Sequence, residues 1–190
     1  MNFYDSLASF RRDSRTRIGI TSLLVLSLAA LIAPARADNL SARVKLYDTV
    51  GQRVGIARLT QQGDGKVVVS VRVHDLPAGF HGFHVHTVGE CIPPFTSAGG
   101  HFDKNGNTHK DHAGDLPVLL ANTEGTATAR FMTDRFAVAD LVDADGSAVI
   151  IHANPDNYAN IPDRYVAAPD ATTLATGDAG ARIVCGVVKD

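Results

Sequence analysis

The sequence has no tryptophan, only two methionines and only two cysteines among its 190 residues. Two cysteines exclude a scaffold held by many disulfides, and they exclude a zinc site made of four cysteines. The formal net charge is −2, which argues against a basic surface for nucleic acid. Seventeen glycines and eight prolines indicate a chain rich in turns rather than in helices. Apolar residues at 45% and charged residues at 20% are ordinary for a globular protein and argue against a disordered chain.

The longest apolar run lies near the N-terminus and is shorter than the roughly 20 residues that a membrane helix needs. This run, Ile18–Ile32, follows a segment with four arginines and precedes the small-residue pattern Ala35-Arg36-Ala37. The order predicts a secretory signal peptide over residues 1–37, cleaved near Ala37–Asp38. A membrane anchor is the weaker alternative. The pair Arg11-Arg12 also raises a twin-arginine export route, which the flanking residues support poorly.

Cleavage there leaves one domain, residues 38–190, with 13 basic and 18 acidic residues and a net charge of −5. We therefore expect an acidic exported protein, in the periplasm, outside the cell or in the cell envelope, with no stable membrane insertion and no nucleic-acid partner. An exported chain meets an oxidising compartment, so Cys91 and Cys185 are expected to form a disulfide bond. Two free thiols are the alternative.

Residues 38–190 have the pattern of short strands separated by tight turns. The clearest strand is 66–73, in which four valines share one face. Further strands are expected at residues 41–47, 54–59, 80–88, 116–121, 126–132, 147–152 and 182–188. Long loops follow at 89–115 and 153–180, and loops of this length are usually functional. No segment has a sustained helical period, so about eight strands predict an antiparallel sandwich or barrel.

Histidine is unusually frequent, because eight are present and six of them fall within residues 74–109. Residues two apart in a strand point to the same side. His84 and His86 therefore leave one face of their strand, while Phe83 and Val85 enter the core. Two imidazoles so placed can share one metal ion, although surface pairs of histidines without a function are common.

Three further segments strengthen the prediction of a metal site. His101 follows Gly99-Gly100, glycines that let the backbone turn closely beside a site. Residues 108–115 then hold two histidines and two aspartates within eight positions. His152 ends an apolar strand, where a buried imidazole needs a partner, and a metal ion is the partner that we expect.

Two histidines are not expected to bind metal. His81 has the same strand parity as Phe83 and Val85, so its ring should point inward and form hydrogen bonds. His74 lies at a strand end beside a turn and should be exposed.

Four motifs occur in one order and extend over essentially all of residues 38–190. They are Gly82-Phe83-His84-Val85-His86, Ser97-Ala98-Gly99-Gly100-His101-Phe102, His112-Ala113-Gly114-Asp115-Leu116 and Gly177-Asp178-Ala179-Gly180-Ala181-Arg182-Ile183-Val184-Cys185-Gly186. Together they resemble the copper/zinc superoxide dismutases, in an exported bacterial form. The resemblance implies an all-β fold, an eight-stranded antiparallel Greek-key sandwich or barrel with two long functional loops.

The same resemblance implies which residues bind the metals. The implied copper ligands are His84, His86, His101 and His152. The implied zinc ligands are His101, His109, His112 and Asp115. His101 would be an imidazolate shared by both metals, and Asp156 would be the outer carboxylate that joins a copper-binding to a zinc-binding histidine. The Cys91–Cys185 disulfide would tie the first long loop to the strand that carries Arg182.

The implied activity is the dismutation of superoxide to oxygen and hydrogen peroxide, by alternate reduction and oxidation of copper beside a structural zinc. Arg182 would hold the anionic substrate. His101 would leave the copper and take up a proton on reduction. The oligomeric state stays open, a homodimer included.

Two other functions compete with the enzyme. The first is a non-catalytic exported protein that binds copper and zinc. Arg182 favours the enzyme, because a storage protein needs no anchor for an anion beside an open copper position. The second is a sandwich-type adhesin or chaperone with unused histidines, and the retention of every ligand position argues against it.

The zinc loop departs from the family pattern. Only two residues separate His109 from His112, which predicts a weaker zinc site. Lys104 and Lys110 lie close to the ligands in sequence, while Ala175 stands where many relatives have a lysine near the channel. The two lysines are expected either to attract superoxide or to be simply solvated.

Overall fold

The computed structural model describes residues 40–166 and 168–189, so the predicted signal peptide lies outside the described residues. Nine strands lie within these ranges. They are β1 (Ser41–Asp48), β2 (Arg53–Gln61), β3 (Val67–Val73), β4 (Gly79–His81), β5 (Phe83–His86), β6 (Leu119–Ala121), β7 (Ala127–Thr133), β8 (Ala148–His152) and β9 (Arg182–Val187).

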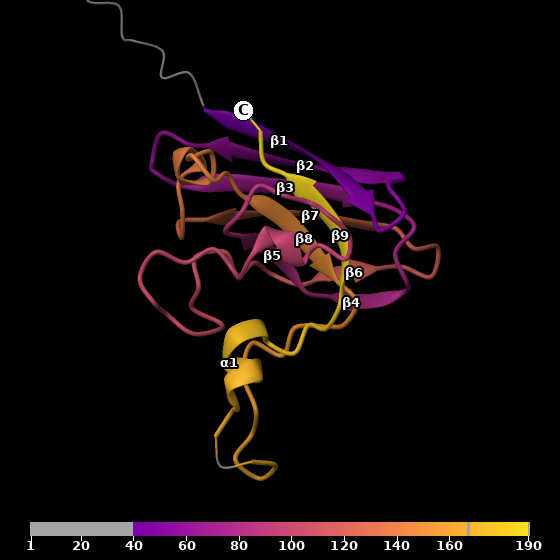
Figure 1. The fold of residues 1–190 in the computed structure, drawn as a ribbon, viewed down its shortest axis with the longest axis vertical. Coiled ribbons are helices and arrows are strands. Elements are labelled where there is room, and N and C mark those ends of the chain that lie inside the picture. Colours follow the sequence, from indigo (N-terminus) through magenta and orange to yellow (C-terminus); the bar gives the residue numbers. More distant parts are fainter. Residues whose placement is uncertain (1–39, 167, 190) are drawn as a thin grey trace, which may run out of the picture. The chain divides into compact units, whose positions relative to one another are not determined.

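Seven of the strands form one antiparallel sheet in the order β5-β8-β9-β1-β2-β3-β7, and β4 pairs with β6 (Figure 1). The last strand therefore lies beside the first, with Tyr47 paired to Cys185. The sheet curls around the core, which confirms the predicted antiparallel, mostly β class. The two long loops extend from its strands and carry little regular structure.

The core follows from strand alternation. On β1, Ala42, Val44 and Leu46 are buried while the residues between them are exposed. The same cluster includes Phe83 and Val85 of β5, so the curled sheet encloses one main core. Burial of each Val or Leu side chain contributes on the order of 2 kcal/mol. This rigid sheet positions the polar residues that point away from the core.

The predicted strand 80–88 is wrong as a single strand, because it is divided at Gly82. The backbone of Gly82 bonds to the end of β8 and the start of the second loop, because its N–H donates to the carbonyl of Asn154 and its carbonyl accepts from His152 N–H. A Cβ atom at Gly82 would lie 2.7 Å from the Cβ of Ala179, so the close approach requires glycine. The division yields nine strands rather than eight. The strand predicted at 116–121 is shorter, at Leu119–Ala121.

One short helix was not predicted, α1 (Ala171–Thr176), in the second long loop. Asp170 caps it by accepting a hydrogen bond from Thr173 N–H at 2.8 Å, and Gly177 ends it with a φ of 57°. Six residues are too few to show a helical period in the sequence. Two single-turn 3₁₀ helices, Thr96–Ala98 and Val138–Leu141, lie in other connections.

The predicted disulfide is present between Cys91 and Cys185, with Cα atoms 5.7 Å apart. It joins the start of the first long loop to β9. No helix within residues 40–166 and 168–189 is long and apolar enough to span a membrane.

Candidate metal centre

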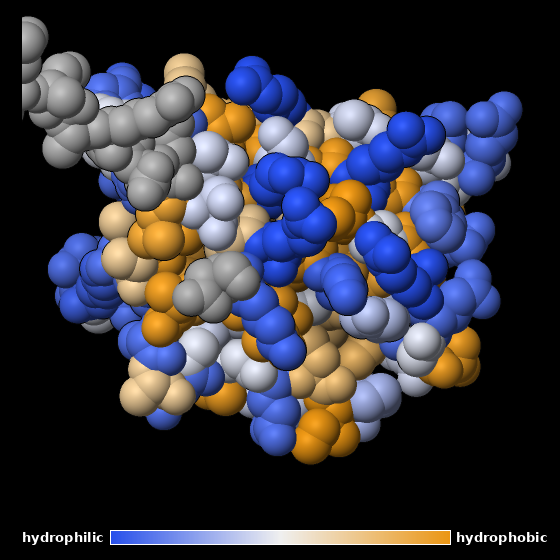
Figure 2. All heavy atoms as spheres, turned by 90° about the horizontal axis from the view of Figure 1, so that it is seen from above, coloured by the Kyte–Doolittle hydropathy of each residue, from blue (hydrophilic) through white to orange (hydrophobic). Residues whose placement is uncertain are grey.

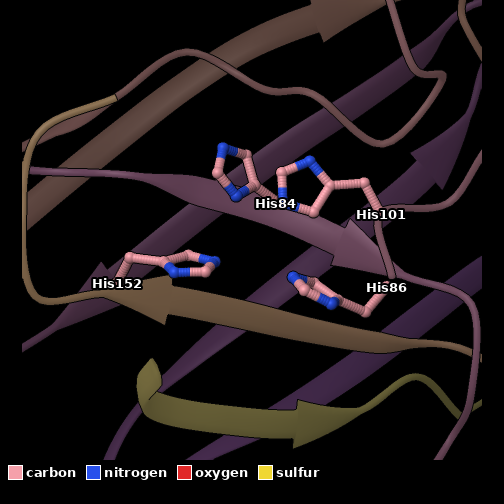
Figure 3. Close-up of side chains that lie close together, drawn as sticks. All are labelled: His84, His86, His101 and His152. Atoms are coloured by element: carbon pink, nitrogen blue, oxygen red, sulfur yellow. The ribbon is translucent and has the colours of Figure 1, made fainter. Parts of the chain in front are cut away.

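Four histidines converge in one buried group. His84 and His86 lie on β5, and His152 ends the neighbouring strand β8. His101, from the first loop, forms a bridge to His86 through its backbone. One ring nitrogen from each of the four lies within 4.8 Å of the others. Figure 3 shows the four rings pointing toward a common space. The sheet therefore fixes three of the rings, and the loop adds the fourth.

A second buried group adjoins the first and is centred on Asp115. The Oδ1 atom of Asp115 lies 2.7 Å from Nδ1 of His101. Its Oδ2 atom lies 3.1 Å from Nδ1 of both His109 and His112. One atom from each of these four residues lies within 4.8 Å of the others. His101 belongs to both groups, so the structure places the two predicted ligand sets side by side.

Several buried ring nitrogens in these groups have no hydrogen-bond partner within the described part of the chain. They are Nδ1 of His84, Nε2 of His86, Nε2 of His152 and Nδ1 of His109. A buried polar nitrogen without a partner is costly, so such groups are rare in folded proteins. Neutral imidazole nitrogens suit copper and zinc, and a carboxylate suits zinc. The residues present therefore fit two metal ions.

Asp156 joins the two groups. Its Oδ2 atom accepts a hydrogen bond of 2.7 Å from Nε2 of His84, and its Oδ1 atom lies 2.7 Å from Nε2 of His109. In both histidines the opposite nitrogen, Nδ1, is the unpartnered one. The carboxylate thus orients each ring so that Nδ1 faces its metal-binding group. Gly177 permits this approach, since a Cβ atom there would collide with both Asp156 and His109.

Comparison with known proteins identifies the family. Residues 53–188 match the family described as copper/zinc superoxide dismutase.

The chain belongs to the copper/zinc superoxide dismutase family.

It is 38% identical over 179 residues to a "Superoxide dismutase [Cu-Zn]" of Mycolicibacterium paratuberculosis, a match that covers 84% of this chain and 78% of the relative. Among solved structures, the Cu/Zn superoxide dismutase from Brucella abortus has a TM-score of 0.64 at 30% identity, covering 79% of this chain and 100% of that one. A SOD-like protein from Bacillus subtilis has a TM-score of 0.62 at 30% identity, covering 76% and 96%. Family membership makes the chain an oxidoreductase that uses copper and zinc.

The histidines of this family member differ strongly in proton affinity. Burial lowers the pKa of His101 to about 4, and burial together with the charge of His84 lowers the pKa of His152 to about 3. Burial also lowers the pKa of His86 well below its usual value. For His109 burial acts in the same direction, but the nearby carboxylates of Asp115 and Asp156 overcome it and raise the pKa to about 9. The imidazoles of His86, His101 and His152 are therefore neutral at pH 7, the form that binds metal.

Both carboxylates in the centre stay ionised. Burial would raise the pKa of Asp115, but His101 and His109 hold it well below the usual value. Burial opposes the shift at Asp156 too, where hydrogen bonds from His109 and His84 lower the pKa. Two anionic side chains thus face the cluster of imidazoles, which offsets the charge of bound metal ions.

Arg182 lies beside the first histidine group. Its guanidinium donates hydrogen bonds of 2.6 Å to the carbonyl groups of Phe95 and Gly99. The Gly99 carbonyl also accepts a 3.0 Å hydrogen bond from Nδ1 of His86, so one carbonyl links the arginine to the histidine group. A guanidinium has five N–H donors, and the remaining ones stay available for an anion.

Other sequence predictions have definite outcomes. His81 is buried and lies 2.7 Å and 2.8 Å from the carbonyl oxygens of His152 and Pro77, as predicted for an inward ring. His74 is exposed, also as predicted. Lys104 forms an ion pair with Asp140, with Nζ and Oδ1 2.5 Å apart, which its sequence neighbours did not indicate.

The sequence did not predict two residues that contact the centre, Arg135 and Tyr158. Arg135 donates hydrogen bonds from Nη1 to the carbonyl groups of Lys110 (2.7 Å) and His112 (3.0 Å), and so fixes the short connection between His109 and His112. Tyr158 stacks near His109, with ring centroids 6.4 Å apart, and accepts a hydrogen bond from Val118 N–H. Both lie far from the loop in sequence, and neither belongs to a motif that signals metal chemistry.

Proposed function

We propose that this chain dismutates superoxide at a copper ion bound by one histidine group, beside a zinc ion bound by the other. The proposed copper ligands are His84, His86, His101 and His152. The proposed zinc ligands are His101, His109, His112 and Asp115. The observation that carries the proposal is the set of buried, unpartnered ring nitrogens that face these two spaces.

Copper, when bound, supplies the one-electron acceptor for oxidation of one superoxide to oxygen and the one-electron donor for reduction of a second superoxide, with two protons, to hydrogen peroxide. The protein's residues orient and hold the substrate and supply a proton to the product. Arg182 offers its free N–H groups to the anionic substrate next to the first group. His101 has Nδ1 2.7 Å from Asp115 on the side of the second group, and its other ring nitrogen would hold a proton when not bound to copper and release it to the product.

The non-catalytic alternative is less favoured because of Arg182. A metal-storage protein gains nothing from a half-buried guanidinium that is fixed by two carbonyl groups with donors to spare. An anion-consuming enzyme gains a positioned anchor for its substrate.

We further propose that residues 1–37 are a removable export signal and that residues 38–190 function outside the cytosol. The disulfide supports this, because such bonds persist in oxidising compartments.

The test is a superoxide dismutation assay on copper- and zinc-loaded protein, with metal content measured in parallel. Wild type should be active, and His86→Ala should lose both copper and activity. Arg182→Lys keeps a cation and should retain part of the rate, whereas Arg182→Glu should keep both metals and lose most of it. His74→Ala, an exposed histidine, is the matched control. An inactive, fully loaded wild type would establish the storage function instead.

A further inference from the structure

A basic face covers the outer side of four neighbouring strands, far in sequence from the histidines. It consists of Arg43 and Lys45 on β1, Arg53 and Arg58 on β2, Arg72 on β3 and Arg130 on β7. All six side chains are exposed. Strand pairing sets Arg43 opposite Arg58, Arg58 opposite Ser70, and Ser70 opposite Arg130. Figure 2, a view from the β1 side, shows strongly hydrophilic side chains gathered over the middle of the molecule.

The charges form a two-dimensional array. Arg43, Arg58 and Arg130 lie in one row across the strands, and Lys45 and Arg72 lie in the next. Neighbouring strands are about 4.8 Å apart, and residues two apart along a strand are about 6.8 Å apart. Arg53 lies opposite Tyr47 in a third row, so the array extends about 14 Å across four strands and over three rows along them. Such an arrangement presents charge to a surface rather than to a single bound ion.

Nothing in the described residues neutralises this face. None of its six cations takes part in an ion pair within 4.0 Å with another residue of 40–166 or 168–189. The one acidic residue within β1, β2, β3 and β7 is Asp48, whose carboxylate accepts hydrogen bonds from the backbone of Val50 and Gln52. Like charges directly opposite each other destabilise a sheet, so Arg43 and Arg58 carry a cost that an anionic partner would relieve.

The positive charge of this face is opposite in sign to the net charge of the domain. Residues 38–190 have 13 basic and 18 acidic residues, and six of the basic ones lie on this face. The remainder of the domain thus has seven basic residues against the same 18 acidic ones. Positive and negative charges are therefore separated on the domain, and its negative net charge is compatible with a local cationic surface.

These cations are not placed to attract superoxide to the metal centre. On β1 to β3 they point away from the core, while His84 and His86 point away from the same core on β5, where Phe83 and Val85 point inward. The core lies between the two surfaces. A partner bound to the basic face leaves the metal centre accessible.

We propose that the basic face docks the protein on a bilayer surface rich in anionic phospholipids. Lys and Arg side chains are attracted to such surfaces, and mobile headgroups can match a fixed two-dimensional array of cations. Tyr47 and Met132, exposed on the same side of β1 and β7, supply apolar contacts at the interface. Tyr47 is the only aromatic residue on the outer side of these four strands, so the stacking that single-stranded nucleic acid requires is absent there.

The experiment is co-sedimentation of the metal-loaded protein, residues 38–190, with vesicles at about 0.1 M salt. One set contains phosphatidylcholine alone, and the other contains phosphatidylcholine with phosphatidylglycerol. The test variant is Arg43→Gln, Arg58→Gln, Arg130→Gln. The matched control, Lys66→Gln, Lys104→Gln, Arg164→Gln, removes the same charge from exposed positions elsewhere. Soluble dextran sulfate and DNA serve as competing polyanions.

We expect the wild type and the control variant to sediment with the anionic vesicles and not to sediment with the neutral ones. Each Lys or Arg near an anionic membrane changes affinity by about fivefold, so the test variant should bind about 100-fold more weakly, and added salt should release the wild type. Equal binding by the test variant and the control would overturn the proposal. Binding to dextran sulfate or DNA without binding to anionic vesicles would overturn it as well, because it would assign the face to a polymer.

Discussion

Asp156 holds one imidazole from each metal group with a single carboxylate, 2.7 Å from Nε2 of His84 and 2.7 Å from Nε2 of His109. It also accepts a 2.7 Å hydrogen bond from the backbone N–H of Tyr158, which fixes the carboxylate itself. The two groups are thus mechanically linked twice, through the shared ring of His101 and through Asp156. Disturbing one group is expected to affect the other.

Replacing Asp156 by Asn should weaken the zinc site more than the copper site. The amide has one oxygen in place of the two that face the imidazoles, and the substitution removes a negative charge from beside His109. Loss of such an outer partner typically lowers metal affinity by about 10–100-fold. Competition with a zinc chelator measures the effect, with Asp163→Asn on the same loop as the control. Zinc affinity equal to that of the wild type would show that Asp156 does not orient His109.

Acid should remove zinc before copper. In the metal-free protein the pKa of His109 is raised to about 9, so at pH 7 zinc must displace a proton, and falling pH favours the proton over the metal. The pKa values of about 4 for His101 and about 3 for His152 keep those rings neutral until the solution is far more acidic. Dialysis in steps from pH 7 to pH 4, with both metals measured at each step, tests this order. Simultaneous loss of the two metals would contradict it.

Reducing the Cys91–Cys185 bond should lower thermal stability. The two cysteines are 94 residues apart, and a bridge over a loop of that length stabilises by about 4–5 kcal/mol in the chain-entropy model. The bond also secures the loop in which Phe95 accepts the hydrogen bond from Arg182. The thermal midpoint should be compared before and after thiol treatment, with two free thiols per chain verified. An unchanged midpoint would mean that packing alone holds the loop.

The two loop lysines should differ in their effect on rate. Lys104 is neutralised by its ion pair with Asp140, whereas Lys110 is exposed and has no ion pair among the described residues. Lys110→Gln should therefore slow the reaction at low salt and flatten its dependence on ionic strength, since screening acts over roughly 10 Å at 0.1 M. Lys104→Gln should change neither. Equal rates and salt slopes for both variants and the wild type would show that neither lysine steers superoxide.

The sequence alone predicted the strands with strong alternation and the residues that converge on the centre. On β1 and β3 every second side chain is apolar, and this period of two is visible without a structure. His84 and His86 on β5 follow the same parity rule. His152 ends β8, whereas His101, His109, His112 and Asp115 lie in a loop without any period. The residues alone indicated a metal site, and the division of these residues into two ligand sets was predicted only through the family motifs.

The features that the sequence did not disclose depend on contacts between distant segments. Gly82 divides a strand because the second loop approaches it, and Arg135 fixes the zinc loop from more than 20 residues away. The basic face is similar, because its six cations alternate with buried residues on four strands and come together only through the register of the sheet. The net charge of the chain does not depend on where its cations lie, so it could not indicate this cationic surface.

The most direct test of the proposed centre is anomalous X-ray diffraction from crystals of the metal-loaded protein, recorded at the copper and zinc absorption edges. The proposal predicts a copper peak bounded by Nδ1 of His84, Nε2 of His86 and Nε2 of His152. It predicts a separate zinc peak beside Asp115, with the ring of His101 between the two. A single mixed peak, or metals bound away from these unpartnered nitrogens, would contradict it.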